Sequence, residues 1–266
     1  MQPNQLPLKK TKIVCTIGPA SSDPATLEAM IDRGMNIARI NFAHGDFDAH
    51  RQAIANVRAA ARKSGQRVAI FGDLPGPKMR IGQLAEEPIE LVRGQPFVLQ
   101  TEPCVGDASR VSLDFEELPR VVSAGDNIFV NDGYIQLTVQ RVEGATIHCI
   151  VRVGGELRSH KGVNFPGIDL GISAFTERDR ELLAFAAEQK LDAVSQSFVA
   201  GAEDIAAVRE AAAALKYDPL IIAKIERAGA LAQIDAILEA ADAIMVARGD
   251  LGVEIPIEEI PRCKSS

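Results

Sequence analysis

The segment LIIAKIE at residues 220–226 is a short apolar run that ends with Lys224 and Glu226 on either side of Ile225. A run of aliphatic and β-branched residues of this length is typical of a buried strand. Successive side chains of a strand point to opposite faces, so Lys224 and Glu226 share one face and Ile225 takes the other. The same pattern, an apolar run with a polar end, occurs at residues 12–16, 37–41, 68–73, 193–198, 220–226 and 243–248.

Helical patterns separate these runs. Asp23 followed by Pro24 predicts a helix start, and Thr176 with Asp179 predicts a capping box. An apolar stripe with helical spacing runs from Ile205 to Leu215. The strand starts recur about every 25 to 30 residues, which is the size of a βαβ unit. The alternation predicts an α/β fold with a parallel sheet of the (β/α)₈ barrel type.

A different pattern interrupts the alternation between about Gly82 and Phe165. Apolar and polar residues alternate there with period two, and Asn131-Asp132-Gly133 and Glu143-Gly144 are hairpin turn signals. We therefore predict a small antiparallel β-barrel domain at residues 82–165, inserted into a partial barrel made of residues 1–81 and 166–266. Its role is either a lid over an active site or a passive insertion.

Composition narrows the class of protein. The 266 residues are 47% hydrophobic and 24% charged, which suits a globular core and excludes disorder, collagen and coiled coil. The net charge of −7 lacks the basic excess that nucleic acid binding needs. No apolar run approaches the roughly 18 residues of a membrane helix, so we expect a soluble, cytoplasmic protein without a membrane partner. Neither a zinc site nor a disulfide framework is indicated by the scattered cysteines, which are Cys15, Cys104, Cys149 and Cys263.

The polar strand ends carry the candidate chemistry, because ligands bind at the carboxyl ends of parallel strands. Lys224 and Glu226 place an ammonium and a carboxylate together, and Asp250 adds a second carboxylate on a neighbouring strand. Two carboxylates with substrate oxygens suit Mg²⁺. Arg39, Arg80 and Lys224 offer the positive charge that a phosphoryl group needs.

Each of these features also has a structural interpretation. Lys224 with Glu226 can be a strand-end ion pair, Asp250 a turn residue, and Gly72 to Pro77 a rigid turn. The sequence contains no Walker loop and no G-x-G-x-x-G, so it does not support a P-loop or Rossmann nucleotide site. The functional interpretation is favoured because four such ends fall on the same face.

Several stretches together resemble a known family. They are KIVCTIGPAS at 12–21, ARINFAHG at 38–45, GPKMR at 76–80, KGVNFPG at 161–167, AKIE at 223–226 and MVARGDLGVE at 245–254. In this order they resemble pyruvate kinase over nearly the whole chain. The resemblance implies the glycolytic transfer of phosphate from phosphoenolpyruvate to ADP, giving pyruvate and ATP, on a (β/α)₈ barrel with an inserted lid.

The resemblance also implies roles for individual residues. Arg39 would bind the transferred phosphoryl group, and Lys224 would stabilise the charge on it and on the enolate oxygen. Glu226 and Asp250 would hold Mg²⁺, and the backbone at Gly249 and Asp250 would take the substrate carboxylate. The nucleotide phosphates would be bound by Asn41, Arg80, Lys161 and, as a weaker candidate, His44.

The monovalent-cation site of the family is altered in this chain. The matching positions are Asn41, Ala43, Asp73 and Leu74, and Ala43 lacks the hydroxyl ligand of the family. Family members that need K⁺ tend to have Glu where this chain has Lys78, whose ammonium can supply the missing positive charge. We therefore expect no K⁺ requirement.

The resemblance covers only the first part of the family's length. Without the insert, about 180 residues remain, enough for six βα units of about 30 residues but not for the eight of a closed barrel. We expect an open barrel whose first and sixth strands are exposed edges, which leaves room for a homo-oligomer but does not imply the family tetramer. The alternatives to an active enzyme are an inactive fragment that binds Mg²⁺ and phosphoenolpyruvate or assembles with a partner, and a different pyruvate-handling barrel such as an aldolase.

Overall fold

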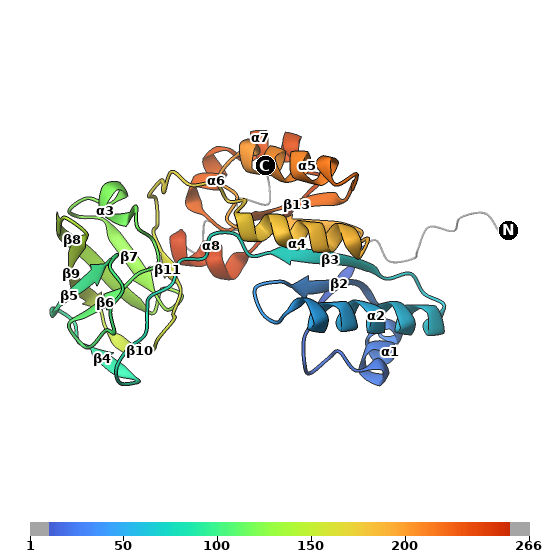
Figure 1. Cartoon of the computed structure of the whole chain (residues 1–266), viewed down its shortest axis with the longest axis horizontal. Helices are drawn as coiled ribbons and strands as arrows, with labels where there is room; N and C mark the ends of the chain where they lie inside the picture. Colours follow the sequence, from blue (N-terminus) through green and yellow to red (C-terminus); the bar gives the residue numbers. More distant parts are fainter. Residues whose placement is uncertain (1–10, 256–266) are drawn as a thin grey trace.

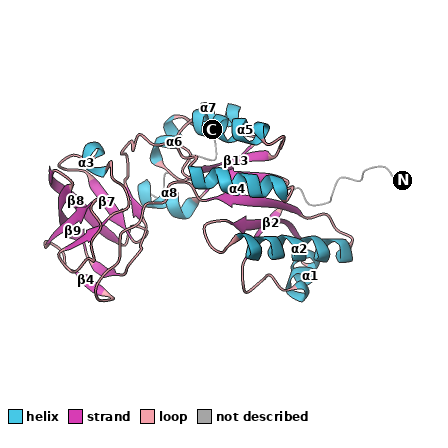
Figure 2. Cartoon of the chain, viewed as in Figure 1, coloured by secondary structure: helices cyan, strands magenta, loops and turns pink. Residues whose placement is uncertain are grey.

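The computed structural model describes residues 11–255, in which a parallel six-stranded sheet lies beside a mixed six-stranded sheet (Figures 1 and 2). We call the parallel sheet, which is flanked by most of the helices, the large sheet, and the mixed sheet the small sheet. All strand pairs of the large sheet are parallel, as predicted. Its strands, in spatial order, are β1 (Ile13–Ile17), β2 (Met35–Asn41), β3 (Ala69–Leu74), β12 (Ala193–Gln196), β13 (Leu220–Ile225) and β14 (Ala243–Val246).

Helices follow the strands of the large sheet and are bounded by local sequence signals. The Asp23 carboxylate accepts a hydrogen bond from the Thr26 N–H at 3.0 Å at the start of the first helix. Thr176 and Asp179 form the predicted capping box. The helices are α1 (Pro24–Asp32), α2 (Phe47–Ser64), α4 (Glu177–Glu188), α5 (Ala202–Ala214), α6 (Ala228–Ala232), α7 (Ile234–Ala240) and α8 (Arg248–Glu254).

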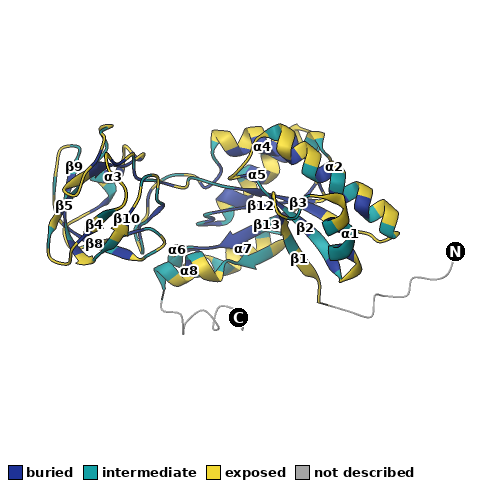
Figure 3. Cartoon of the chain, turned by 90° about the horizontal axis from the view of Figure 1, so that it is seen from below, coloured by how far each residue is buried: buried dark blue, intermediate teal, exposed yellow. Residues whose placement is uncertain are grey.

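The main core lies between the large sheet and these helices. Leu27 of α1, Ile54 of α2, Leu183 of α4 and Ile205 of α5 are all buried in it. Figure 3 shows the central strands β3, β12 and β13 largely buried, with β1 and the outer helix faces exposed. One prediction is wrong: Leu215 is 44% exposed, because α5 ends at Ala214 and Leu215 is its C-cap.

The large sheet is an open, incomplete barrel. Among residues 11–255, β1 and β14 each pair with one strand, so both are edges. Ile13 and Val14 on β1 are 45% and 48% exposed, which is unusual for aliphatic residues of a parallel sheet. This arrangement confirms the predicted six βα units with an unclosed barrel.

The small sheet is built from residues of the predicted insert. The Asn131 to Gly133 turn has positive φ angles at all three residues and joins two strands that pair antiparallel. The strand order of the larger sheet in this part is β11 (Val163–Asn164), β7 (Asn127–Val130), β8 (Ile135–Glu143), β9 (Thr146–Val153), β5 (Pro96–Gln100) and β6 (Arg110–Ser112). A two-stranded sheet, β4 (Ile89–Leu91) with β10 (Gly155–Leu157), and the short helix α3 (Leu118–Val121) complete it.

Residues 80–81 join the two edges of the small sheet. Arg80 pairs with Gly162, just before β11, and Ile81 pairs with Leu113, just after β6. These bridges close the sheet on itself around a second apolar core that includes Phe97 and Leu137. The prediction of a purely antiparallel sheet is wrong in one place, because β5 and β6 are parallel.

The second core extends slightly beyond the predicted insert. Met79 and Leu170 both pack in it, just outside the predicted limits of residues 82–165. The domain boundaries themselves stay a prediction.

None of the helices within residues 11–255 has the length and apolar character needed to cross a bilayer.

Candidate functional site

A cavity of about 400 Å³ opens at the carboxyl ends of the parallel strands. Four strand ends and α8 contribute to it, which is the end of a parallel sheet where ligands bind. The residues predicted for the site that line it are Arg39, Asn41, His44, Asp73, Arg80, Lys224, Glu226 and Asp250. The structure thus brings together residues that lie up to 211 positions apart, from Arg39 to Asp250.

Arg39 on β2 is bound to the carboxylate of Asp73 on β3. Its Nε donates to Asp73 Oδ2 at 2.8 Å, and its Nη2 donates to the same oxygen. Its Nη1 donates to Thr16 Oγ1 at 3.4 Å. The Arg39 side chain is 28% exposed while that of Asp73 is 3% exposed, so the guanidinium reaches the cavity from a buried anchor.

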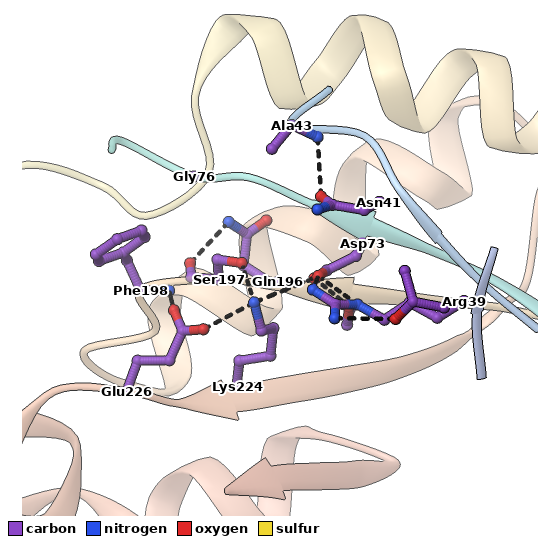
Figure 4. Close-up of polar contacts among 12 residues, drawn as sticks. Arg39, Asn41, Ala43, Asp73, Gly76, Gln196, Ser197, Phe198, Lys224 and Glu226 are labelled. Carbon is purple, nitrogen blue, oxygen red and sulfur yellow. Dashed lines mark hydrogen bonds and ion pairs between the residues drawn. The ribbon is translucent and has the colours of Figure 1, made fainter. Parts of the chain in front are cut away.

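Lys224 on β13 is surrounded by oxygen atoms (Figure 4). Its Nζ lies 2.7 Å from Glu226 Oε1 and donates to Ser197 Oγ, also at 2.7 Å. The Nζ also lies 3.3 Å from Asp73 Oδ1. The ammonium is therefore paired with two carboxylates, which a cation with 7% residue exposure requires.

Glu226 follows β13 directly and points to the same side as Lys224. Its Oε2 accepts a hydrogen bond from the Phe198 N–H at 2.9 Å, while Oε1 contacts Lys224. Ile225 between them is 1% exposed in the main core. The predicted alternation of faces is confirmed at this strand.

Asp250 reaches the cavity from a helix and not from a strand as predicted. Val246 ends β14 and Arg248 starts α8, so Asp250 lies in the first turn of that helix. It nevertheless lines the same cavity as Lys224 and Glu226. Gly249 precedes it on α8 and is exposed, with nothing within 4 Å of the place where a side chain would start.

The two carboxylates of Glu226 and Asp250 fit a magnesium ion. Both line the same cavity, and carboxylate oxygens are the protein ligands that Mg²⁺ takes, usually one or two per site with water and substrate oxygens. Each oxygen of Glu226 makes one contact and has a further lone pair. Within the described residues, no group of three or more His, Cys, Asp or Glu could hold a metal ion.

The predicted monovalent-cation ligands are engaged in other bonds. Asn41 Oδ1 accepts the Ala43 N–H at 3.1 Å, and Asp73 binds Arg39 and Lys224. The Leu74 carbonyl accepts the Ser197 N–H at 3.2 Å. This donor set is poorer for K⁺ than that of the family, because Ala43 has no hydroxyl and the one carboxylate already pairs with two cations.

Lys161 and Gly249 are not among the described residues that line the cavity, unlike Arg80 and His44. The Arg80 Nη1 donates to the His160 carbonyl at 2.9 Å, which ties it to the small sheet. Lys161 is half-buried and its carbonyl accepts the Ile81 N–H at 3.0 Å.

Some polar side chains at the site were not predicted. Ser195 and Ser197 lie on alternate positions at the end of β12, and Ser195 Oγ donates to Asp73 Oδ1 at 2.7 Å. Arg178 at the start of α4 lines the cavity. The serines carry the period-two signal that identified Lys224 and Glu226, whereas nothing in the sequence around Arg178 distinguishes it from a surface helix residue.

A larger cavity of about 710 Å³ lies between residues 167–173 and the starts of α5 and α6. Its charged groups hold the backbone: Asp204 accepts the Ala174 N–H at 2.8 Å, and Arg227 donates to the Ile168 carbonyl at 3.0 Å. Burial raises the pKa of Glu254 in its wall. Because its polar groups serve the loop, the smaller cavity is the candidate site.

Comparison with known proteins identifies the family of the chain. Residues 8–265 match the family described as pyruvate kinase, barrel domain. The chain is 47% identical over 257 residues to a pyruvate kinase of Thermococcus litoralis, covering 97% of this chain and 54% of that protein. It is 44% identical over 258 residues to a pyruvate kinase of Geobacillus stearothermophilus, covering 95% of this chain and 44% of that protein. The chain therefore spans about half the length of the curated relatives it matches.

Proposed function

Because the chain belongs to the pyruvate kinase family, we propose that its strand-end cavity takes part in phosphoryl transfer from phosphoenolpyruvate to ADP, giving pyruvate and ATP. One observation carries the proposal: Arg39 and Lys224, from two strands that are not neighbours, converge on one cavity beside Glu226 and Asp250. Two cations beside two carboxylates are what a phosphoryl group and its divalent ion require.

The cations of the site act on the group in transfer. Arg39 binds the phosphoryl oxygens through the guanidinium hydrogens that Asp73 does not use. Lys224 stabilises the negative charge that develops on the phosphoryl group and on the enolate oxygen. The phosphorus–enol oxygen bond breaks, a bond to the terminal oxygen of ADP forms, and the enolate takes a proton to give pyruvate.

The carboxylates and the remaining polar groups position the reactants. Glu226 and Asp250 would hold Mg²⁺, which when bound supplies positive charge to the phosphoryl and carboxylate oxygens. The backbone at Gly249 and Asp250 would take the substrate carboxylate. The nucleotide phosphates would be bound by Asn41, Arg80, His44 and Lys161, with the small sheet as a lid.

A glycolytic enzyme of this kind would act in the cytoplasm without K⁺. The engaged Asp73 carboxylate and the Lys78 ammonium at the cavity both support K⁺ independence. Rates should be unchanged when K⁺ is replaced by tetramethylammonium. A strong loss of turnover in tetramethylammonium would show that K⁺ is required.

The direct test is a coupled assay of pyruvate formed from phosphoenolpyruvate and ADP with Mg²⁺. Lys224→Met should reduce turnover by about 10³-fold, since it removes the charge next to the developing oxyanion. Lys63→Met is the matched control, because its ammonium pairs with Glu28 on the surface, away from the cavity. Wild-type turnover equal to that of Lys224→Met would refute catalysis by this chain.

The open sheet favours a second candidate function. Because β1 and β14 are edge strands among residues 11–255, the sheet does not close around the site, and such a site would bind ligands without turning them over. The chain would then be a module that binds Mg²⁺ and phosphoenolpyruvate. Calorimetry would show Mg²⁺-dependent binding of phosphoenolpyruvate that Lys224→Met abolishes, with no pyruvate formed.

A further inference from the structure

The Asp73 carboxylate is the point at which four adjacent strands meet. Arg39 comes from β2, Asp73 from β3, Ser195 from β12 and Lys224 from β13, and these strands are consecutive in the sheet. Oδ2 accepts from Arg39 and Oδ1 accepts from Ser195 Oγ at 2.7 Å. Lys224 Nζ lies 3.3 Å from Oδ1 and 3.4 Å from Oδ2. One carboxylate thus fixes both cations relative to each other.

The position of Asp73 makes this arrangement rigid. Asp73 is 2% exposed, Ser195 is fully buried, and both lie on central strands with a partner on each side. The carboxylate therefore cannot relax toward water when a ligand enters. Arg39, by contrast, has 28% of its side chain exposed and is otherwise held by a 3.4 Å bond to Thr16.

Charge at the centre of the site sums to zero. Arg39 and Lys224 contribute two positive charges, and Asp73 and Glu226 two negative ones. Arg80, Arg178, Lys78 and Asp250 add further charges around the cavity. An anion that enters between Arg39 and Lys224 meets the negative charge of Asp73 behind them.

We propose that Asp73 is a positioning residue that holds Arg39 and Lys224 at the spacing a phosphoryl group needs, and that its charge prevents anions from binding there without a divalent cation. The proposal rests on the proposed function, because it assigns Asp73 a task in the same site. Asp73 acts through the two cations, because its carboxylate is almost fully buried and both of its oxygens are bonded to neighbouring side chains.

The first test measures, without any substrate, how tightly Asp73 holds Arg39; we call this contact of Asp73 with Arg39 and Lys224 the clamp. Phenylglyoxal modifies free guanidinium groups, and mass spectrometry of the Arg39 peptide gives the rate. Asp73→Asn keeps the shape but removes the charge, so Arg39 should react at least about threefold faster, since charge-assisted bonds are the stronger ones. Thr16→Val, which removes the uncharged partner of Arg39, should leave the rate unchanged.

The second test separates positioning from a merely structural role. In Asp73→Asn without Mg²⁺, phosphoenolpyruvate should bind at least about fivefold tighter by calorimetry, because one buried negative charge is gone. Turnover with Mg²⁺ should fall about 10²-fold, because the two cations lose their fixed spacing. A structural defect would weaken binding and turnover together.

Ser195→Ala provides a second variant that keeps the charge of Asp73. It removes one bond that fixes the carboxylate, so Arg39 labelling should rise in the same direction by a smaller factor. If Asp73→Asn does not fold, unchanged labelling in Ser195→Ala overturns the proposal. Unchanged labelling in a folded Asp73→Asn, or weaker Mg²⁺-free binding, overturns it as well.

The two tests also distinguish this proposal from the proposed function. If Arg39 labelling rises in Asp73→Asn but wild-type protein does not bind phosphoenolpyruvate with Mg²⁺, the clamp stands and the proposed function falls. If wild-type protein binds phosphoenolpyruvate and labelling does not change, the proposed function stands and the clamp falls.

Discussion

The large sheet buries Asp73, Lys224 and Glu226 at its strand ends, whereas the buried polar residues of the small sheet are the uncharged Ser112 and Thr138. Buried charges cost desolvation free energy that pairing restores only in part, while buried apolar side chains stabilise a fold. In the large sheet, burial at the strand ends holds charged groups in place at a cost in stability. In the small sheet, burial of apolar side chains mainly stabilises the fold. Substitutions in the two regions should therefore affect different quantities.

Glu226→Gln should show the largest effect, and that effect should be on activity. The amide can still accept the Phe198 N–H, but the charge beside Lys224 and one ligand for Mg²⁺ are lost. We expect turnover in the pyruvate assay to fall about 10³-fold. Glu156→Gln, on the exposed two-stranded sheet, is the matched control and should keep wild-type turnover. Retention of turnover within tenfold in Glu226→Gln would contradict the assigned role.

Leu137→Ala should show the opposite behaviour in the small sheet. Leu137 is fully buried in the second core, and such a substitution costs about 2–5 kcal/mol of the free energy of unfolding. Hydrogen exchange should lose protection in β7, β8 and β9 while β12 and β13 keep theirs. Tyr134→Ala, at a residue that is 75% exposed, should change stability by less than about 0.5 kcal/mol. Equal loss of protection in both sheets would show that the two cores do not unfold separately.

Both sheets could be predicted in outline from the sequence, because the apolar residues of each region recur with a clear period. Six apolar runs with polar ends gave the parallel sheet, and Lys224 and Glu226 were placed on one face by counting alone. The sequence did not show that Asp73 binds both Arg39 and Lys224, because that contact joins residues 34 and 151 positions apart. Nor did it show that Asp250 lies on a helix, since Arg248 to Glu254 carries no start signal with a side-chain cap.

Gly133→Ala should show how the two regions are coupled. A side chain at Gly133, in the β7–β8 turn, would begin 3.1 Å from Val253 of α8, the helix that carries Asp250. Gly125 also has a positive φ, but an added Cβ there would have nothing within 4 Å. Gly125→Ala is therefore the control for backbone strain alone, which should cost about 1 kcal/mol of the free energy of unfolding in each variant. Only Gly133→Ala should raise the Mg²⁺ concentration needed for half-maximal turnover. Identical Mg²⁺ dependence in the two variants would show that the contact does not reach the site.

The smallest effects should come from two carboxylates on either side of β14. Burial, followed by the charges of Glu226 and Asp250, raises the pKa of Glu254 from 4.5, against the opposing bond from the Ala228 N–H. At the other end of the strand, the Ile221 N–H and then Arg209 lower the pKa of Asp242 from 3.8. The surroundings of Glu254, near the site, therefore disfavour its ionised form. The surroundings of Asp242, at the other end of β14, favour its ionised form.

The two shifts predict opposite pH dependences. Protonated Glu254 contributes to the free energy of unfolding, fully below pH 4.5, and this contribution is lost as pH rises through its raised pKa. At pH 7 the ionised carboxylate is therefore unfavourable in the folded state, and the neutral side chain of Glu254→Gln should stabilise the protein. The contribution of Asp242 is full above pH 3.8 and lost as pH falls through its lowered pKa, so Asp242→Asn should destabilise at pH 7. Each change should be about 1 kcal/mol, because Asp242 is partly solvent-screened and Glu254 keeps one hydrogen bond. Urea unfolding between pH 3 and 7 without divalent cations measures both, and destabilisation by Glu254→Gln at pH 7 would show that this charge near the site carries no stability cost.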